Sequence, residues 1–234
     1  MTTSIYVALD FPSWTEANQF LENNQLVGIP VKVGMELFYR EGPAVIEKLK
    51  KKNHPIFLDL KLHDIPTTVK KAMKNIATLE PDIVNVHALG GAKMIQAAKE
   101  GLLSASGNLK TKLIAVTLLT SHDNRLMNDE LLIPGKITEN VVHYAQLAKD
   151  NGADGVVCSV HEAKQIKEAC GSEFLTVTPG IRLEDSASDD QIRIATPAFA
   201  KRNGADRLVI GRSITKANEP LEAYKRAVEE WENG

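Results

Sequence analysis

The stretch FLDLKLHDIP, residues 57–66, places Asp59, Lys61 and Asp64 in a segment that otherwise has the apolar composition of a buried strand. Alternate residues of a strand share a face, so Asp59 and Lys61 point the same way and the leucines beside them point the other way. Taking ions out of water costs several kcal/mol each unless they are paired. Charges buried in this way either satisfy only each other or supply the electrostatics of a functional site.

Two further charges follow the same pattern at the ends of neighbouring apolar segments. Lys32 lies in VKVG, and Asp10 closes YVALD. A structural ion-pair network is the alternative for any single pair, but apolar residues would often stabilise a core as well as four ions do. We therefore interpret this set as one functional constellation, made of Asp10, Lys32, Asp59 and Lys61.

The elements that must position these residues alternate between short β-rich segments and helical segments along the chain. Apolar runs, several of them continuous, predict parallel strands covered on both sides, at residues 4–10, 30–37, 55–62, 82–89, 112–119, 155–160, 174–181 and 206–213. Helical spacing lies between them, for example at 13–23, 42–52, 93–104 and 141–150. Eight units in 234 residues predict an α/β fold, a (β/α)8 TIM barrel that forms a single domain over residues 1–234, rather than a six-strand doubly wound sheet.

The phrase NGAD occurs twice, at 151–154 and 203–206, each time before an apolar run. Gly152 and Gly204 suit the left-handed position that ends a helix, so the phrase marks a repeated turn from helix to strand. The polar connection 119–135 is longer than the others, and we expect it to cap the mouth of the barrel.

A barrel of this kind carries its active site at the C-terminal ends of its strands, where the four charges are expected. The segments TPGIR, 178–182, and VIGRS, 209–213, each end a strand with glycine followed by arginine. Loops after strands seven and eight often hold phosphate, so Gly211 and Arg212 predict a phosphorylated substrate. Arg182 is a weaker candidate, and a surface ion pair is the alternative for either arginine.

The polar segment LEDSASDDQ, 183–191, has no periodicity and precedes a predicted helix start at Thr196-Pro197. This composition suits a loop that closes over a ligand, with Gln191 as its most useful hydrogen-bonding side chain. An ordinary solvated loop has the same composition.

Composition excludes several classes of protein. The formal net charge of −2 argues against a nucleic-acid binder, and no apolar run is long enough to span a membrane. Two cysteines without a CxxC spacing, and a start that lacks a signal peptide, predict a cytoplasmic protein. The six histidines form no HxH or HExxH arrangement, and no nucleotide-cofactor motif is found, so we expect neither a metal nor a cofactor.

The motif D-x-K-x-x-D at 59–64, together with Asp10, Lys32 and the two glycine–arginine loops, resembles the orotidine 5'-monophosphate decarboxylase family. The resemblance covers nearly the whole chain, from YVALD to GRSIT, and its most specific part is DLKLHDIPTTV. It implies a cofactor-independent enzyme that converts orotidine 5'-monophosphate to uridine 5'-monophosphate (UMP) and CO2, the last step of UMP biosynthesis.

The resemblance also implies a role for each matching residue. Lys61 would be the proton donor, Asp59 the carboxylate beside the leaving carboxyl group, and Lys32 the cation that completes the network and meets the ribose. Asp64, Ile65 and Thr68 would be presented to the site of a neighbouring subunit, so the functional form would be a homodimer with shared sites. The remaining contacts to the small-molecule substrate would come from Asp10 at the ribose, Thr120 near the pyrimidine, and Arg182, Gln191, Gly211 and Arg212 at the phosphate.

Two other functions remain open. Phosphosugar enzymes of the same superfamily share D-x-K-x-x-D but place a Mg2+-binding glutamate on the second strand, where this chain has Lys32 and where Glu36 lies four residues further on. A catalytically silent barrel that binds a nucleotide as a sensor is the second alternative. Intact Asp59 and Lys61 argue against it.

Overall fold

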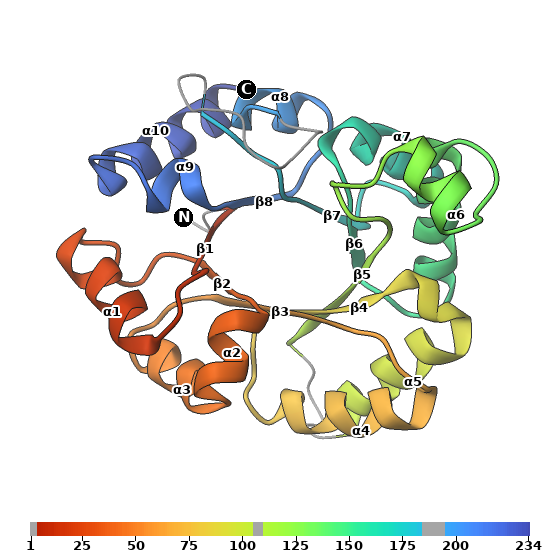
Figure 1. Cartoon of the computed structure of the whole chain (residues 1–234), viewed down its shortest axis with the longest axis horizontal. Coiled ribbons are helices and arrows are strands. Elements are labelled where there is room, and N and C mark those ends of the chain that lie inside the picture. The colour runs from red at the N-terminus through yellow and green to blue at the C-terminus, as the bar shows by residue number, and fades with distance from the viewer. Residues whose placement is uncertain (1–3, 105–109, 184–194) are drawn as a thin grey trace.

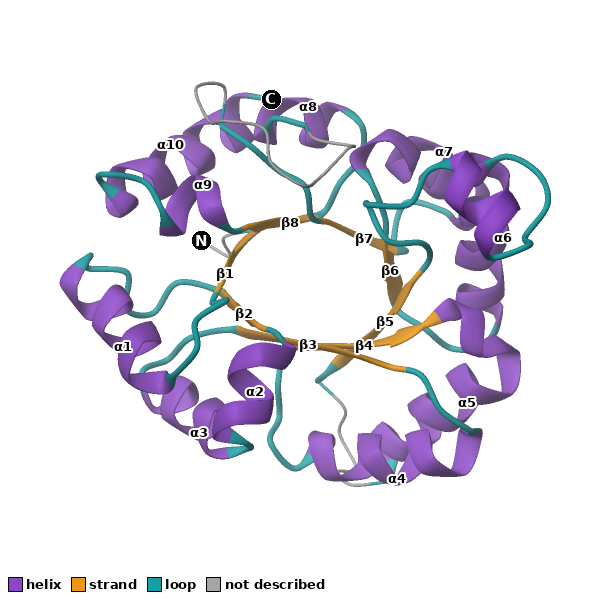
Figure 2. Cartoon of the chain, in the orientation of Figure 1, coloured by secondary structure: helices purple, strands orange, loops and turns teal. Residues whose placement is uncertain are grey.

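The computed structural model describes residues 4–104, 110–183 and 195–234. Parallel strands follow one another around a closed barrel, with helices outside it (Figures 1 and 2). This arrangement confirms the predicted (β/α)8 barrel. The strands are β1 (Ile5–Ala8), β2 (Val31–Val33), β3 (Ile56–Leu62), β4 (Ile83–His87), β5 (Lys112–Val116), β6 (Gly155–Val157), β7 (Leu175–Thr178) and β8 (Arg207–Ile210).

The connections between the strands are mainly helical. The α-helices are α1 (Trp14–Asn23), α2 (Met35–Glu41), α3 (Ala44–Lys51), α4 (Pro66–Ala77), α5 (Gly91–Leu103), α6 (Ile137–Asp150), α7 (Val160–Cys170), α8 (Pro197–Arg202), α9 (Arg212–Thr215) and α10 (Pro220–Asn233). A 3-10 turn (Ala88–Gly90) follows β4, and a short π-helix (Leu126–Glu130) lies in the connection after β5.

Apolar side chains fill two layers, one inside the barrel and one between the barrel and its helices. Tyr6 and Ala8 of β1 belong to the inner cluster, whereas Ile5 and Val7 belong to the outer cluster. Because both faces of the strand are buried, the continuous apolar runs of the sequence are explained. The rigid inner cluster forms a floor on which a site at the strand ends can be built.

Several strands end earlier than predicted because a helix begins inside the apolar run. β2 stops at Val33, and Gly34 then acts as the N-cap of α2, so the second half of the predicted strand 30–37 is helical. β6 stops at Val157, and Ser159 caps α7 in a capping box with Glu162. An apolar run alone does not distinguish a buried strand from the first turn of a buried helix.

The NGAD repeat forms the same turn twice at the N-terminal ends of the strands. Gly152 and Gly204 have φ angles of 91° and 84°, which confirms the predicted left-handed positions. The aspartate two residues further on accepts a hydrogen bond from the backbone of the preceding strand. Asp154 accepts from Leu113 at 2.8 Å, and Asp206 accepts from Thr176 at 2.7 Å.

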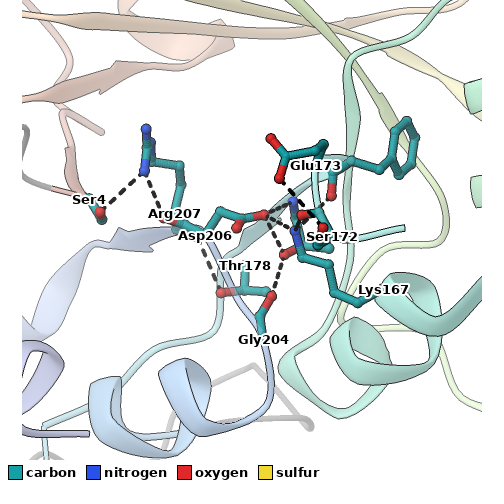
Figure 3. A network of polar contacts seen from close by, with 10 residues as sticks. Ser4, Lys167, Ser172, Glu173, Thr178, Gly204, Asp206 and Arg207 are labelled. Carbon is teal, nitrogen blue, oxygen red and sulfur yellow. Dashed lines mark hydrogen bonds and ion pairs between the residues drawn. The ribbon is translucent and has the colours of Figure 1, made fainter. Parts of the chain in front are cut away.

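Each of these aspartates also pairs with a lysine of the helix that leads into the neighbouring strand. Lys99 of α5 lies 2.7 Å from Asp154, and Lys167 of α7 lies 2.6 Å from Asp206. Figure 3 shows the second pair, with Arg207 beside it reaching Ser4 at the start of the described chain. The repeated motif therefore fastens helix to strand at the barrel end opposite the predicted site, where residues of such barrels serve stability.

Within the described residues, no helix has the length and hydropathy needed to cross a membrane.

Candidate active site

A pocket of about 600 Å³ opens at the C-terminal ends of the strands. Its floor is the inner apolar cluster, to which Phe57 and Val209 contribute. Lys61 and the other three charges of the predicted constellation line one part, while the loops after β7 and β8 line another. This volume is typical of sites that bind small molecules.

The four predicted charges meet as a chain of alternating sign. Lys61 Nζ lies 2.7 Å from Asp59 Oδ1, Lys32 Nζ lies 3.3 Å from Asp59 Oδ2, and Lys32 Nζ lies 3.2 Å from Asp10 Oδ1. Asp59 and Lys32 are buried, whereas Asp10 is exposed at the mouth. The predicted convergence of strands β1, β2 and β3 on one charged site is therefore confirmed.

The two buried members of this chain hold each other in their charged forms. Burial alone would raise the pKa of Asp59, but the ammonium groups of Lys32 and Lys61 outweigh it and place the pKa below its usual value. Burial likewise would lower the pKa of Lys32, yet the carboxylates of Asp59 and Asp10 raise it above the usual value. Gly34 keeps room for this pairing, since a Cβ there would lie 3.1 Å from Lys32 Nζ.

The backbone of Lys61 has an unusual conformation that the sequence did not predict. Its φ angle is 52°, a left-handed value that costs a non-glycine residue about 1–2 kcal/mol. Strand β3 bulges here, because Leu58 pairs with Val84 but Leu62 pairs with Val86. Three residues of β3 thus stand opposite Asn85 alone.

Asn85 is a site residue that the sequence reasoning missed. Its side chain is buried, accepts a hydrogen bond from Lys61 N–H at 2.8 Å and donates one to Asp59 Oδ1 at 2.7 Å. The available signal was a single amide in the middle of the apolar run IVNVH, since such a group must find partners when buried.

Two histidines lie at the rim beside Lys61. The rings of His63 and His87 are 5.5 Å apart, and His87 Nδ1 is buried without a hydrogen-bond partner among the described residues. Burial, followed by the nearby charges of His63 and Lys61, lowers the pKa of His87 to about 4. The imidazole is therefore neutral at physiological pH.

The predicted phosphate end of the pocket is formed by the loops after β7 and β8. Arg182 is buried and Arg212 is half-buried, and both line the pocket together with Gly180 and Gly211. A Cβ at Gly211 would meet only Ala8, at an ordinary distance of 3.7 Å. The backbone of Gly211 has φ −104° and ψ −109°, an unusual combination for a residue with a side chain, and the residue lines the pocket.

The connection after β5 contributes the side wall. Leu119, Thr120 and Ser121 line the pocket. Gln191 lies outside the described residues. The segments that flank its loop are fastened together, because Ile181 and Ala195 form a parallel bridge at the edge of the site.

Asp64, Ile65 and Thr68 are exposed and do not line the pocket of their own chain. The carboxylate of Asp64 accepts a hydrogen bond from Ile65 N–H at 2.6 Å, and Ile65 is the N-cap of α4. The side chain of Ile65 is 67% exposed.

No group of three or more His, Cys, Asp or Glu side chains in the described parts of the chain is arranged to hold a metal ion. Glu36 lies exposed on α2 and does not line the pocket. Lys32 instead fills the space between Asp10 and Asp59.

Comparison with known proteins identifies the family. The model of the "Orotidine 5'-phosphate decarboxylase / HUMPS family" matches residues 3–227. A protein of Bacillus pumilus (strain SAFR-032) named orotidine 5'-phosphate decarboxylase is 58% identical over 228 residues, 97% of either chain. Its namesake from Bacillus caldolyticus is 53% identical over 236 residues, 100% of this chain and 97% of the relative. The crystal structure of orotidine 5'-phosphate decarboxylase from Lactobacillus acidophilus, 42% identical, has a TM-score of 0.86 and covers 99% of both chains. The chain therefore belongs to the orotidine 5'-phosphate decarboxylase / HUMPS family.

Proposed function

We propose that the chain decarboxylates orotidine 5'-monophosphate to UMP and CO2, the last step of UMP biosynthesis, without a cofactor. The observation that carries the proposal is the alternating chain of Asp10, Lys32, Asp59 and Lys61 at one part of a pocket whose other part is lined by Arg182 and Arg212. Its relatives of more than 50% identity bear the name of this activity.

The proposed chemistry follows from the charges. Cleavage of the bond between C6 and the carboxyl carbon releases CO2 and leaves an electron pair on C6. The ammonium of Lys61 stabilises this charge as it develops and then transfers a proton from Nζ to C6. The neutral amine regains a proton from water. Asp59 holds the Lys61 ammonium in place through the 2.7 Å ion pair.

Repulsion between Asp59 and the substrate carboxylate contributes less than this stabilisation. Two unit charges 4 Å apart repel by about 4 kcal/mol at an effective dielectric constant of 20, whereas enzymes lower barriers by about 8–23 kcal/mol. Stabilisation of the transition state must therefore provide most of the rate.

The remaining contacts are proposed from the places of the described residues around the pocket and, for Gln191, from the family resemblance alone. Asp10 and Lys32 meet the ribose, Thr120 lies beside the pyrimidine, and Arg182, Gln191, Gly211 and Arg212 hold the phosphate. Since the phosphate is remote from C6, its binding energy can drive closure over the ligand and so raise kcat as well as affinity.

We further propose a homodimer in which each site is completed by the partner. Asp64, Ile65 and Thr68 are exposed at the start of α4, directly after the strand that carries Asp59 and Lys61. A carboxylate and an apolar side chain at this surface suit insertion beside the Lys61 ammonium of a second copy.

The phosphosugar enzymes of the same superfamily are the competing assignment. Their Mg2+-binding glutamate would stand at position 32, and here a lysine is ion-paired with Asp10 and Asp59. A divalent cation at that position would be repelled by the ammonium, so Lys32 favours the nucleotide substrate.

The deciding experiment mixes purified protein with orotidine 5'-monophosphate in excess EDTA and follows the pyrimidine absorbance, with UMP identified as the product. Rapid conversion supports the proposal. Activity on a sugar phosphate that needs Mg2+ would replace it with the superfamily alternative. Tight nucleotide binding without turnover would favour the sensor.

A further inference from the structure

Strand β4 contributes one polar side chain, that of Asn85, to the interior of the charged site. We infer that Asn85 is a positioning residue that fixes Lys61 and Asp59 relative to each other through both ends of its amide. The inference deepens the proposed decarboxylase function and rests on it for the kinetic consequences described below.

The bulge in β3 changes the hydrogen bonding of the Lys61 backbone. Because Leu58 pairs with Val84 and Leu62 pairs with Val86, the ladder has no regular backbone partner for Lys61 N–H. The side-chain oxygen of Asn85 accepts this N–H at 2.8 Å. A side chain thus replaces the missing ladder bond at the residue whose φ angle is left-handed.

The other end of the Asn85 amide contacts Asp59. Asn85 Nδ2 donates to Asp59 Oδ1 at 2.7 Å, and the same oxygen accepts from Lys61 Nζ at 2.7 Å. Asn85, Asp59 and Lys61 therefore form a closed ring of contacts that includes the backbone and the ammonium of Lys61. Buried to 1% exposure, Asn85 has little freedom to move within this ring.

These two contacts favour an amide side chain at position 85. The site requires an acceptor toward Lys61 N–H and a donor toward Asp59, and an amide supplies both in one planar group. An aspartate at this position would keep the acceptor but would face Asp59 with a second carboxylate. Two carboxylates this close share one proton, which raises the pKa of the pair. The fit of an amide between the two partners is therefore chemical and not only steric.

The test compares Asn85→Ala and Asn85→Asp with the wild-type protein. Asn85→Ala removes both contacts, and we expect kcat to fall about 100-fold while KM changes less than about threefold, because a small misplacement of a catalytic group affects the reacting atoms rather than the phosphate. An unchanged kcat, or a loss that lies entirely in KM, would overturn the inference.

Asn85→Asp provides a readout that a merely structural residue would not move. When the new carboxyl is protonated it donates to Asp59 as the amide does, so its kcat relative to the wild type should be highest at low pH. The ratio should then fall about tenfold per pH unit as the shared proton is lost. Asn203→Asp makes the same chemical change at the opposite end of the barrel, where the amide donates to Phe199 O, and its ratio should stay flat. A flat ratio for Asn85→Asp would contradict the inference, and this isosteric variant remains decisive if Asn85→Ala does not fold.

A third measurement separates this inference from the proposed function. Amide hydrogen exchange of Lys61 in the wild type and in Asn85→Ala reports the contact to Asn85 whatever reaction the protein catalyses. We expect the exchange of Lys61 N–H to accelerate at least about tenfold while Leu58 N–H is unchanged. Equal protection of Lys61 in both proteins would refute the positioning role, whereas a wild type that fails to convert orotidine 5'-monophosphate would refute only the decarboxylase assignment.

Discussion

Lys61 Nζ lies 2.7 Å from Asp59 Oδ1 across a bulge in the strand that carries both residues. The lysine reaches this position from a left-handed backbone conformation. The direction of the ammonium is therefore set by the main chain as well as by the charge of its partner.

Replacing Lys61 with alanine should abolish turnover, since the variant lacks both the cation and the proton that the reaction needs. We expect kcat to fall by at least about 1,000-fold, within the range of about 100- to 10,000-fold that a general acid contributes, while UMP binding by calorimetry remains measurable. Lys225→Ala, which removes an exposed lysine paired with Glu222, is the control and should keep full activity. Turnover in Lys61→Ala close to the wild-type rate would remove this residue from the proton-donor role.

Arg212→Ala should lower kcat/KM by loosening the phosphate. The loss of a hydrogen bond to a charged group costs about 1.5–3 kcal/mol, which corresponds to a decrease in kcat/KM of about 10- to 150-fold. Orotidine, which has no phosphate, should react equally with both proteins. Arg202→Ala, at an exposed arginine of α8, serves as the matched control. Equal losses with both substrates would mean that Arg212 does not contact the phosphate.

Mixing two inactive variants tests the shared site. A dimer of Lys61→Ala with Asp64→Ala contains one site with both mutations and one site with neither. Random exchange of subunits should therefore restore about a quarter of the wild-type activity. Absence of any recovery, with exchange verified by mass spectrometry, would place Asp64 in the site of its own chain, and full activity of Asp64→Ala alone would place it outside catalysis.

The stability of the protein should depend on His87 below neutral pH. In the unfolded chain His87 binds a proton with the usual pKa of 6.5, whereas in the folded chain its pKa is about 4. The free energy of unfolding therefore falls as the pH is lowered from 6.5 to about 4, because only the unfolded chain takes up the proton in this range. In His87→Gln this fall should be smaller by about 1–2 kcal/mol, the full pKa difference being reduced because the ring is partly exposed. His54, whose pKa is also lowered by burial, remains in both proteins and leaves a residual slope. Identical pH profiles from urea unfolding would show that His87 is not the titrating group.

At the opposite end of the barrel, Asp206→Ala should reduce stability without changing catalysis. The substitution removes the partner of Lys167 and of Thr176 N–H, for a loss of about 2 kcal/mol. Thermal unfolding and kcat are measured on the same preparation of Asp206→Ala, and we expect a lower unfolding temperature with an unchanged kcat. A loss of kcat at unchanged stability would contradict the division between a structural and a catalytic end.

Much of this architecture follows from periodicity in the sequence. Both faces of the strands are buried, which explains why continuous apolar runs predicted strands. The two-residue period of a strand predicted that the side chains of Asp59 and Lys61 would lie on the same face. The ends of the strands were predicted less well, because Gly34 and Ser159 start helices within apolar runs and only their capping geometry shows it.

The features that were not predicted depend on partners distant in sequence. The left-handed φ of Lys61 arises from a bulge against β4, and the role of Asn85 exists only because the bulge leaves an N–H without a ladder partner. The place of Asp64 at the site of a neighbouring subunit was predicted only from the family resemblance, since its proposed contacts belong to a second chain.

The closure of the barrel has a consequence for synthesis of the protein. Strand β1 pairs with β8, and Ser4 contacts Arg207 across 203 positions of the sequence. At ribosomal rates of about 5–20 residues per second, β8 is synthesised about 10–40 s after β1. During that interval one edge of the nascent sheet is open to other chains. Translation that stops before β8 should therefore yield fragments that aggregate. Pairing of β8 with β1 closes the barrel and removes the open edge from the newly made protein.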